Sequence, residues 1–352
     1  MVLYLRERDI KMGKFKKTVL FICMFLMIAT LCACNKQDNG DNTDNGEIIE
    51  STDGMGSSFE DEPDIEIIPT GNFEEEPDET TPEETTPAPS SDDTFNYRVE
   101  EAGVVIVGLA DGVSVEEIIF PTVIEAKPVV KIEDEAFRHN AVLKSIVLPE
   151  GLLEIGARAF DDCSALVTVE MSATLEVIGN GAFSKCSALE EITLADGVVS
   201  LGTSAFADCS SLKQVNFNEG LISIGAYAFA RCVALEAIWL PDTVSTLGSC
   251  AFYHCEALKD VEVSNRITKL EFGTFMYCKV LKKISLPDSV ESMGHKVFAE
   301  CINLKEVYIT DAVEFMEKDV FEACTLVTIM TPEESYASTW AREHNVKQRN
   351  YY

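Results

Sequence analysis

The sequence has few basic residues for its length. Its 352 residues include 28 Lys and Arg against 60 Asp and Glu, which gives a formal net charge of −32. A surface this acidic repels nucleic acid and anionic lipid. We therefore expect no nucleic-acid partner, and no membrane contact other than through a covalently attached lipid.

Side chains suited to catalysis or to metal binding are also scarce. Only four histidines are present. His139 and His254 lie five 23-residue units apart, roughly 24 Å by strand spacing, which is too far to share a metal; His295 and His344 occupy other positions. The chain has no phosphate loop, zincin motif or nucleophile elbow, and the repeats contain no CxxC or CxxH motif. We expect a non-catalytic protein without metal or cofactor.

The N-terminus carries a short apolar run that is typical of an export signal. The run Val19–Leu31 follows a lysine-rich segment and is shorter than the roughly 20 residues of a membrane span. It ends in "LCAC", which resembles a bacterial lipobox. This resemblance implies a signal peptide over residues 1–33, with lipid on Cys34 as the new N-terminus. Ordinary cleavage with free secretion is the alternative, and translation starts at either Met1 or Met12.

Residues 34–94 have the composition of a disordered stalk. From Asn35 to Thr94 there are about twenty Asp and Glu against one Lys, with many Pro and Thr and few apolar residues. Such a segment cannot bury enough apolar surface to offset the entropy of ordering. Fully extended, sixty residues would reach on the order of 190 Å, enough to hold a folded domain away from a membrane.

Beyond Phe95 a phenylalanine recurs every 23 residues. A fixed period of this length with recurrent leucine is the signature of a leucine-rich solenoid. Each unit reads approximately "LxxIxLPxxLxxIGxxAFxxCxx". The phenylalanines are Phe137, Phe160, Phe183, Phe206, Phe229, Phe252, Phe275, Phe298 and Phe321.

Each part of the unit has a structural interpretation. The alternation in "IxL" predicts a strand with one buried face. The glycine of "IGxxAF" is expected to form a tight turn, and "AFxxC" is long enough for about one helical turn. Stacked units predict a parallel sheet on one face and a phenylalanine column on the other, each unit burying its neighbour. The predicted fold class is an α/β repeat solenoid over residues 95–330.

The unit resembles the BspA-type leucine-rich repeat of bacterial surface proteins, over about residues 115–330. The resemblance implies an adhesin-like protein that binds host extracellular matrix or other cells.

Both ends of the solenoid depart from the repeat, as caps do. "YRVEEAGVVIVGLADG" predicts a β-hairpin that covers the edge of the first strand, Val115–Pro121. The segment 331–352 begins with "TPEESYASTWAREHNV". It predicts a helix with Tyr336, Ala337, Trp340 and Ala341 on one side, closing the other end.

A cysteine lies three residues after the phenylalanine in eight units, whereas the first unit has Asn140 there. Because Asn cannot form a disulfide or act as a thiol nucleophile, we interpret the position as a small buried niche. Disulfides, metal binding and redox chemistry are the alternatives. Cys250 lies outside this series and is expected to be more exposed. The cysteines are Cys163, Cys186, Cys209, Cys232, Cys255, Cys278, Cys301 and Cys324.

The outward-facing side chains of the predicted sheet are the candidate binding surface. They lie eight and ten residues after each phenylalanine. An exposed aromatic among polar neighbours often anchors an interface, although a tryptophan also suits a strand merely by shielding its neighbours. The candidate binding residues are Gln214, Asn216, Trp239, Glu262 and Tyr308.

These features together predict an exported, lipid-anchored surface protein. The favoured function is a non-catalytic module that binds an extracellular protein or glycan, including host matrix. A structural envelope protein without an external ligand is the second hypothesis, and a thiol-based redox protein the third. The sequence leaves the ligand and the oligomeric state open.

Overall fold

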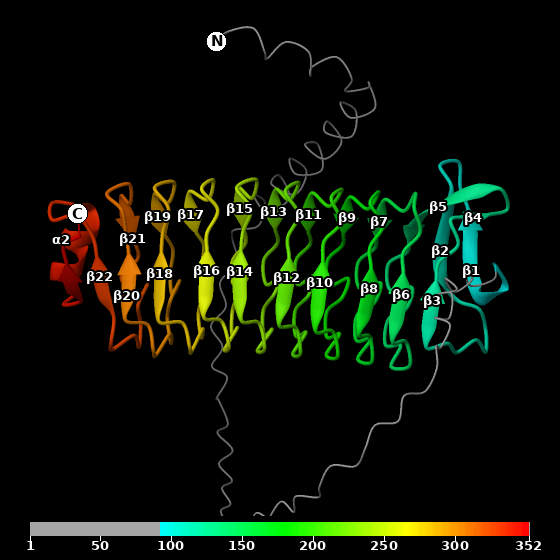
Figure 1. Cartoon of the computed structure of the whole chain (residues 1–352), viewed down its shortest axis with the longest axis horizontal. Coiled ribbons are helices and arrows are strands. Elements are labelled where there is room, and N and C mark those ends of the chain that lie inside the picture. The colour runs from blue at the N-terminus through cyan, green and yellow to red at the C-terminus, as the bar shows by residue number, and fades with distance from the viewer. Residues whose placement is uncertain (1–91, 352) are drawn as a thin grey trace, which may run out of the picture. The chain divides into compact units, whose positions relative to one another are not determined.

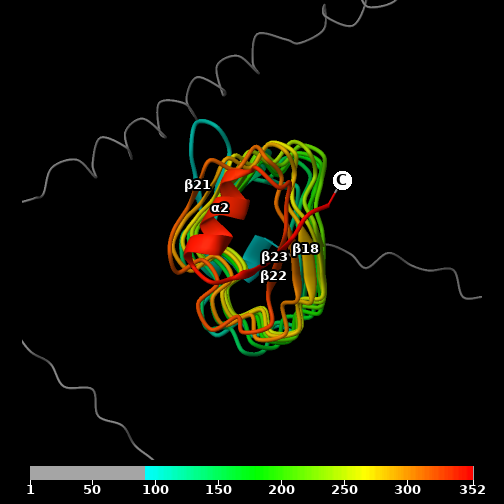
Figure 2. The same ribbon diagram turned by 90° about the vertical axis from the view of Figure 1, so that its left-hand side faces the viewer.

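The computed structural model describes residues 92–351, which form a solenoid of stacked turns (Figure 1). Two arrays of short parallel strands run along it, one on each side (Figure 2). The signal peptide, Cys34 and the stalk up to Ser91 lie outside the described residues. Within residues 92–351, no helix has the length and apolar character needed to cross a membrane.

The first array, here called the long-strand face, contains the predicted "IxL" strands. Neighbouring units pair in parallel with a register of 23 residues, for example Ile192 opposite Val215. The array is hydrogen-bonded in three groups, β3-β6-β8, β10-β12 and β14-β16-β18-β20-β22-β23. Its strands are β3 (Glu117–Ile119), β6 (Ser145–Val147), β8 (Thr168–Glu170), β10 (Glu191–Thr193), β12 (Gln214–Asn216), β14 (Ala237–Trp239), β16 (Asp260–Glu262), β18 (Lys283–Ser285), β20 (Glu306–Tyr308), β22 (Thr328–Met330) and β23 (Lys347–Arg349).

The second array, the short-strand face, was not predicted. Its strands are formed by the residues just before the repeat glycine, and most are only two residues long. They are β7 (Glu154–Ile155), β9 (Val177–Ile178), β11 (Ser200–Leu201), β13 (Ser223–Ile224), β15 (Thr246–Leu247), β17 (Lys269–Leu270), β19 (Ser292–Met293) and β21 (Phe315–Met316). The array is interrupted between β15 and β17.

The "AFxxC" segments form turns and contain no helix. In most units the residue two before the phenylalanine and the residue two after it have positive φ, such as Arg158 at 54° and Asp162 at 61°. A left-handed residue on each side prevents the chain from continuing as a right-handed helix. The N–H groups of these two residues instead donate to the next unit, to Asn180 O and Ser184 O, both at 2.8 Å.

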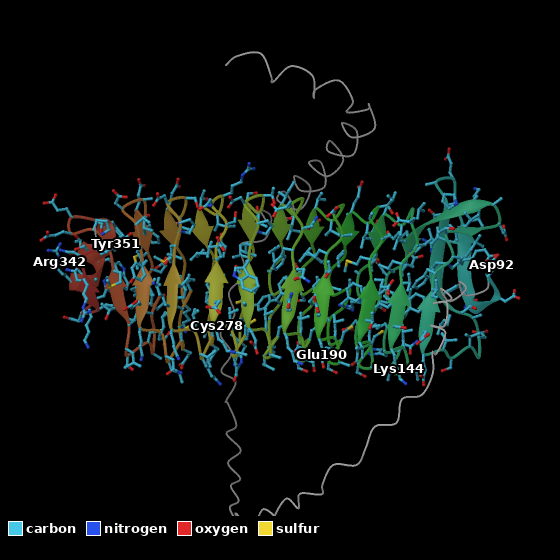
Figure 3. All side chains as sticks on the ribbon, in the orientation of Figure 1. Asp92, Lys144, Glu190, Cys278, Arg342 and Tyr351 are labelled. Carbon is cyan, nitrogen blue, oxygen red and sulfur yellow. The ribbon has the colours of Figure 1, made fainter. Side chains whose placement is uncertain are left out.

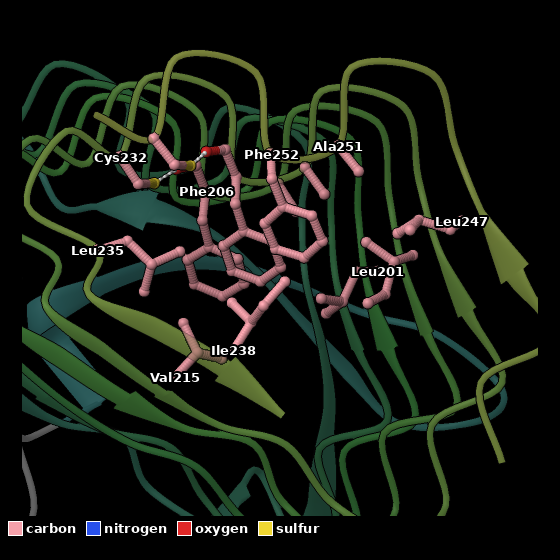
Figure 4. Close-up of a cluster of buried hydrophobic side chains, with 14 of the residues drawn as sticks. Leu201, Phe206, Val215, Cys232, Leu235, Ile238, Leu247, Ala251 and Phe252 are labelled. Carbon is pink, nitrogen blue, oxygen red and sulfur yellow. Dashed lines mark hydrogen bonds between the residues drawn. The ribbon is translucent and has the colours of Figure 1, made fainter. Parts of the chain in front are cut away.

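The phenylalanine column is buried as predicted, but it lies in the core between the two strand arrays and not on the face opposite a single sheet (Figure 4). From Phe137 to Phe321, successive rings are 5.1–5.8 Å apart and within 8° of parallel. Leu and Ile from both strand arrays pack around the rings. Each unit therefore buries the ring of its neighbour, which is why no unit is expected to be stable alone.

The repeat glycines do not have the role that the sequence pattern indicated. The glycines of "IGxxAF" are absent from the positive-φ positions. A Cβ at Gly248 would instead lie 2.3 Å from Ala226 N, in the backbone of the preceding turn. Close stacking of backbones, not turn conformation, excludes a side chain there.

The N-terminal hairpin forms, but it covers a different edge from the one predicted. Strands β1 (Phe95–Val99) and β2 (Val104–Leu109) follow a short 3-10 turn, Asp92–Thr94, and pair antiparallel. β2 then pairs with β5 (Lys127–Ile132), which heads the short-strand face and also holds β4 (Val123–Ile124). The hairpin thus extends the short-strand face. It does not cover the edge of β3, the first strand of the long-strand face, as the sequence had predicted.

The C-terminal cap is a helix followed by one more strand. α2 (Tyr336–Glu343) is capped by the Ser335 side chain and lies across the last turn (Figure 2). Ala337, Trp340 and Ala341 are buried as predicted, while Tyr336 is 38% exposed. The additional strand β23 pairs with β22 and continues the long-strand face to the end of the chain.

Candidate binding face

Each three-residue strand of the long-strand face has two outward side chains, which flank its middle residue. The middle residue of each strand points to the core, and the residues on either side point outward because side chains alternate along a strand. A rigid core behind this face holds the outward side chains in fixed rows. The face is therefore suited to recognition of an extended partner.

Along much of this face, charged side chains pair with one another. Just before the strands, Lys144 pairs with Glu116 at 2.7 Å, Lys213 with Glu190 at 2.8 Å, and Lys259 with Glu236 at 3.1 Å. Lys144 and Glu190 lie at the starting ends of β6 and β10 (Figure 3). Such exposed pairs add little stability, but they occupy these six side chains with one another.

Two of the candidate residues, Gln214 and Asn216, are tied into a local network. Gln214 Nε2 donates to Asn216 Oδ1 at 2.7 Å, and Asn216 Nδ2 donates to Glu191 Oε1 and Thr193 Oγ1 at 2.8 and 3.0 Å. The hydrogen-bonded ladder is also interrupted between β12 and β14. These two residues therefore form a cluster apart from Trp239.

Trp239 and Glu262 are brought together. Trp239 ends β14 with 55% of its surface exposed, and Glu262 is its direct partner in β16. Trp239 has the largest exposed fraction of the exposed large hydrophobic residues in the described chain. The indole is therefore accessible to a partner on this face.

Tyr308 lies two strands beyond Glu262. Its ring packs against Tyr351 with centroids 5.6 Å apart, and Lys283 Nζ lies over the ring at 4.4 Å. Its hydroxyl donates to Glu306 at 3.3 Å. Tyr308 is thus half-buried, and its ring fixes the position of the Lys283 ammonium group on β18.

An open groove of about 890 Å³ runs beside Trp239 over β16 and β18. Its lining includes Trp239, Asp260, Glu262, Lys283 and Ser285 from the strands. Other lining residues come from the segments between strands, which the sequence analysis did not consider. These are Lys259, Val280, Lys282 and Asn303. They lie five or seven residues after the repeat phenylalanine. Because these positions recur in every unit, the repeat pattern could have identified them as neighbours of the strand face.

The eight repeat cysteines lie inside the solenoid. Each is buried and unpaired, and its Sγ donates to the carbonyl of the phenylalanine 26 residues earlier, at 2.8–3.5 Å (Figure 4). Asn140, in the first unit, accepts instead from the N–H groups of Val142 and Leu143 at 3.1 and 3.0 Å. The position links neighbouring turns, and no access for a redox partner is evident.

The expectation that Cys250 would be exposed is wrong. Cys250 is 2% exposed, and its Sγ lies 3.0 Å from where a Cβ on Gly273 would be. The side chain fills the space that Gly273 leaves open in the next turn. Burial also raises the pKa of the Cys250 thiol.

The repeat cysteines are expected to react slowly in the folded protein. Burial raises the pKa of the Cys163 and Cys209 thiols to about 12, and the thiolate is the reactive form. Native protein treated with iodoacetamide at pH 8 should therefore show few of the eight labelled by intact mass, and all of them after denaturation. Rapid labelling of all eight, or masses that show disulfides among them, would contradict this structural role.

The histidines do not form a shared site. His139 Nδ1 contacts Asp162 at 2.9 Å, and His295 lies between Asp319 and Glu317 at 2.9 and 3.3 Å. Over residues 92–351, no group of three or more His, Cys, Asp or Glu side chains is placed to hold a metal ion.

The paired strand arrays, the phenylalanine column and the 23-residue register define a leucine-rich repeat solenoid of the bacterial surface type, an architecture consistent with a binding module. The family model for the "BspA type Leucine rich repeat region" matches residues 112–236 and 222–337, in six copies. The chain belongs to this family, and the resemblance read from the repeat unit is confirmed.

Solved structures of other leucine-rich repeat proteins are similar to this chain. A protein from Bacteroides ovatus is 23% identical with a TM-score of 0.54, over 74% of this chain and 76% of its own. The T. pallidum leucine-rich repeat protein is 26% identical with a TM-score of 0.46, over 62% and 91%. A leucine-rich cell surface protein from Faecalibacterium prausnitzii is 21% identical with a TM-score of 0.33, over 72% and 97%. The first of these supports the fold. No curated protein matches the chain.

Proposed function

We propose that this chain is a non-catalytic, adhesin-like binding module, held on the outer side of a bacterial membrane by a lipid on Cys34. The observation that carries the proposal is the exposed Trp239 above an open groove on a rigid strand face. Hot spots at interfaces are enriched in tryptophan. The acidic stalk would let the solenoid reach an extracellular protein or glycan, such as host matrix.

Adhesion of cells that display the full chain tests the binding function. A bacterial host expressing it should adhere to immobilised matrix proteins or glycans above the level of the same host without it. The Trp239→Ala chain, displayed at equal density, should lose most of this adhesion. If no immobilised matrix protein or glycan distinguishes the expressing host from the empty host, the structural envelope role is favoured and the binding function is rejected.

Replacement of Cys34 tests the anchor. The Cys34→Ala chain cannot receive a thioether-linked lipid, so we expect either release into the medium or retention with an uncleaved signal peptide. Fractionation, with intact mass of the product, distinguishes these results from normal anchoring. A Cys34→Ala chain that is cleaved and still membrane-bound would place the anchor elsewhere.

A further inference from the structure

Four of the polar side chains around Trp239 have no partners within the described part of the chain. Asp260, Glu262, Lys282 and Ser285 all line the groove, and none of their side chains forms a hydrogen bond or ion pair with residues 92–351. In the neighbouring turns, by contrast, Asn216 is bound to Glu191 and Thr193. The groove therefore concentrates free donors and acceptors beside the exposed indole.

Pairing between neighbouring strands is less extensive where the groove lies. β14 pairs with β16 through three residue pairs, and β18 with β20 also through three. Between them, β16 and β18 are registered by the single pair Glu262–Ser285. The groove lies over this less extensively paired junction, and side chains from both strands line it.

The charges that line the groove nearly cancel. Three lysines (Lys259, Lys282 and Lys283) face two carboxylates (Asp260 and Glu262), and Glu236, outside the lining, pairs with Lys259. The balance is neutral, in a chain whose net charge is −32. A strongly anionic ligand would meet unpaired carboxylates, and a strongly cationic one would meet unpaired ammonium groups.

A protein partner fits this chemistry poorly. The cores of protein interfaces are depleted in charged residues and rich in apolar side chains. Here one tryptophan is surrounded by carboxylates, ammonium groups, an amide and a hydroxyl, and the further apolar lining residues are Val261, Val280 and Ile284. A sugar matches better, because its C–H face can stack on an indole while its hydroxyls both donate and accept hydrogen bonds.

We infer that the groove between Trp239 and Lys282 binds a neutral oligosaccharide. The inference rests on the proposed function and narrows it to one ligand class. A sugar ring stacks on the Trp239 indole. Neighbouring hydroxyls donate to the Asp260 and Glu262 carboxylates and accept from Lys282 and Ser285.

Binding of the displayed full chain to immobilised oligosaccharides tests this inference. The neutral set contains oligomers of glucose, galactose, mannose and N-acetylglucosamine. The comparison set contains sialylated and sulfated oligosaccharides together with deglycosylated matrix proteins. We expect binding to members of the neutral set that changes less than about twofold between 50 and 500 mM salt, because no net charge is neutralised.

Three variants localise the binding. Trp239→Ala should weaken it at least about tenfold, as loss of a hot-spot aromatic does. Glu262→Gln, which keeps the shape but replaces an acceptor by a donor, should weaken it about three- to tenfold through one charged hydrogen bond. Phe315→Ala removes an aromatic of similar exposure, 49% against 55%, from the short-strand face and should leave binding unchanged.

The other outcomes overturn the inference in distinguishable ways. Binding only to sialylated or sulfated sugars, with strong weakening by salt, would assign an anionic ligand. Binding to deglycosylated protein but to no sugar would leave the adhesive function standing and reject the oligosaccharide. Neutral-sugar binding that survives in Trp239→Ala would move the site away from the groove, and a chain that binds none of these probes loses both proposals.

Discussion

Replacing Phe229 with alanine is expected to lower the free energy of unfolding by about 3–5 kcal/mol, the range for truncation of a core phenylalanine. Phe229 is fully buried and stacks between Phe206 and Phe252 at 5.4 and 5.6 Å. Phe217 packs against its edge at 5.8 Å. The variant leaves a cavity in mid-column that neither neighbour can fill without shifting its own turn.

Chemical denaturation of wild-type and variant chains measures this loss. Phe315→Ala is the matched control, because Phe315 is 49% exposed on the short-strand face; such surface changes usually alter stability by less than about 0.5 kcal/mol. A loss below about 1 kcal/mol for Phe229→Ala would show that the phenylalanine column does not carry the packing assigned to it.

Replacing Gly248 with alanine is expected to destabilise the solenoid by about 3 kcal/mol, at the upper end for overpacking. The added Cβ would lie 2.3, 2.6 and 2.7 Å from Ala226 N, Gly225 C and Ala226 Cα. All three are backbone atoms, so no side-chain rotation can relieve the contact. The turn itself would have to move away from its neighbour, and it would lose inter-turn hydrogen bonds as it did so.

Gly294 is the matched control for Gly248, because it has the same place in the repeat. A Cβ there would meet its nearest backbone atoms at 3.3 Å, since Glu271 occupies the glycine position one turn earlier. The short-strand ladder is interrupted at that turn, between β15 and β17. Gly294→Ala should change the free energy of unfolding by less than about 1 kcal/mol. The lower entropy of its unfolded chain favours the folded state and offsets part of the tighter contact. Equal losses in the two variants, measured by denaturant midpoint, would contradict the close-stacking role.

The repeat and its core could be predicted because the same residues recur at fixed spacing. Phe160, Cys163 and Leu166 each have a counterpart 23 residues on, and stacking turns this spacing into columns. The short-strand face could not be predicted, since strands of two residues such as Glu154–Ile155 are too short to show an alternation.

The turn conformation was also beyond the sequence pattern. Positive φ usually selects glycine, yet most of these positions carry other residues, such as Tyr227 and His254. Their strain is offset by hydrogen bonds to the next turn, for example from Tyr227 N to Ser249 O at 2.9 Å. These hydrogen bonds depend on the neighbouring unit, so the type of residue at the position does not reveal its positive φ.

The candidate site was found only in part. Parallel strands in register place residues 23 apart side by side in neighbouring units. Trp239 and Glu262 could therefore be predicted as neighbours. The separation of β12 from β14, which leaves Gln214 and Asn216 outside the groove, depends on local divergence of the strands. Lys282 and Asn303 come from connecting segments, where strand alternation makes no prediction.

Quenching of tryptophan fluorescence tests the central claim, that the ligand covers Trp239. The chain has only two tryptophans, and Trp340 is already shielded at 4% exposure, with its Nε1 donating to Met316 O at 3.1 Å. In the free protein, acrylamide should quench one accessible component of the tryptophan emission. The Trp239→Phe variant should lack this component, which assigns it to Trp239. A saturating neutral oligosaccharide should protect that component. A sugar or protein that is bound at saturation and leaves the quenching of Trp239 unchanged would contradict the account.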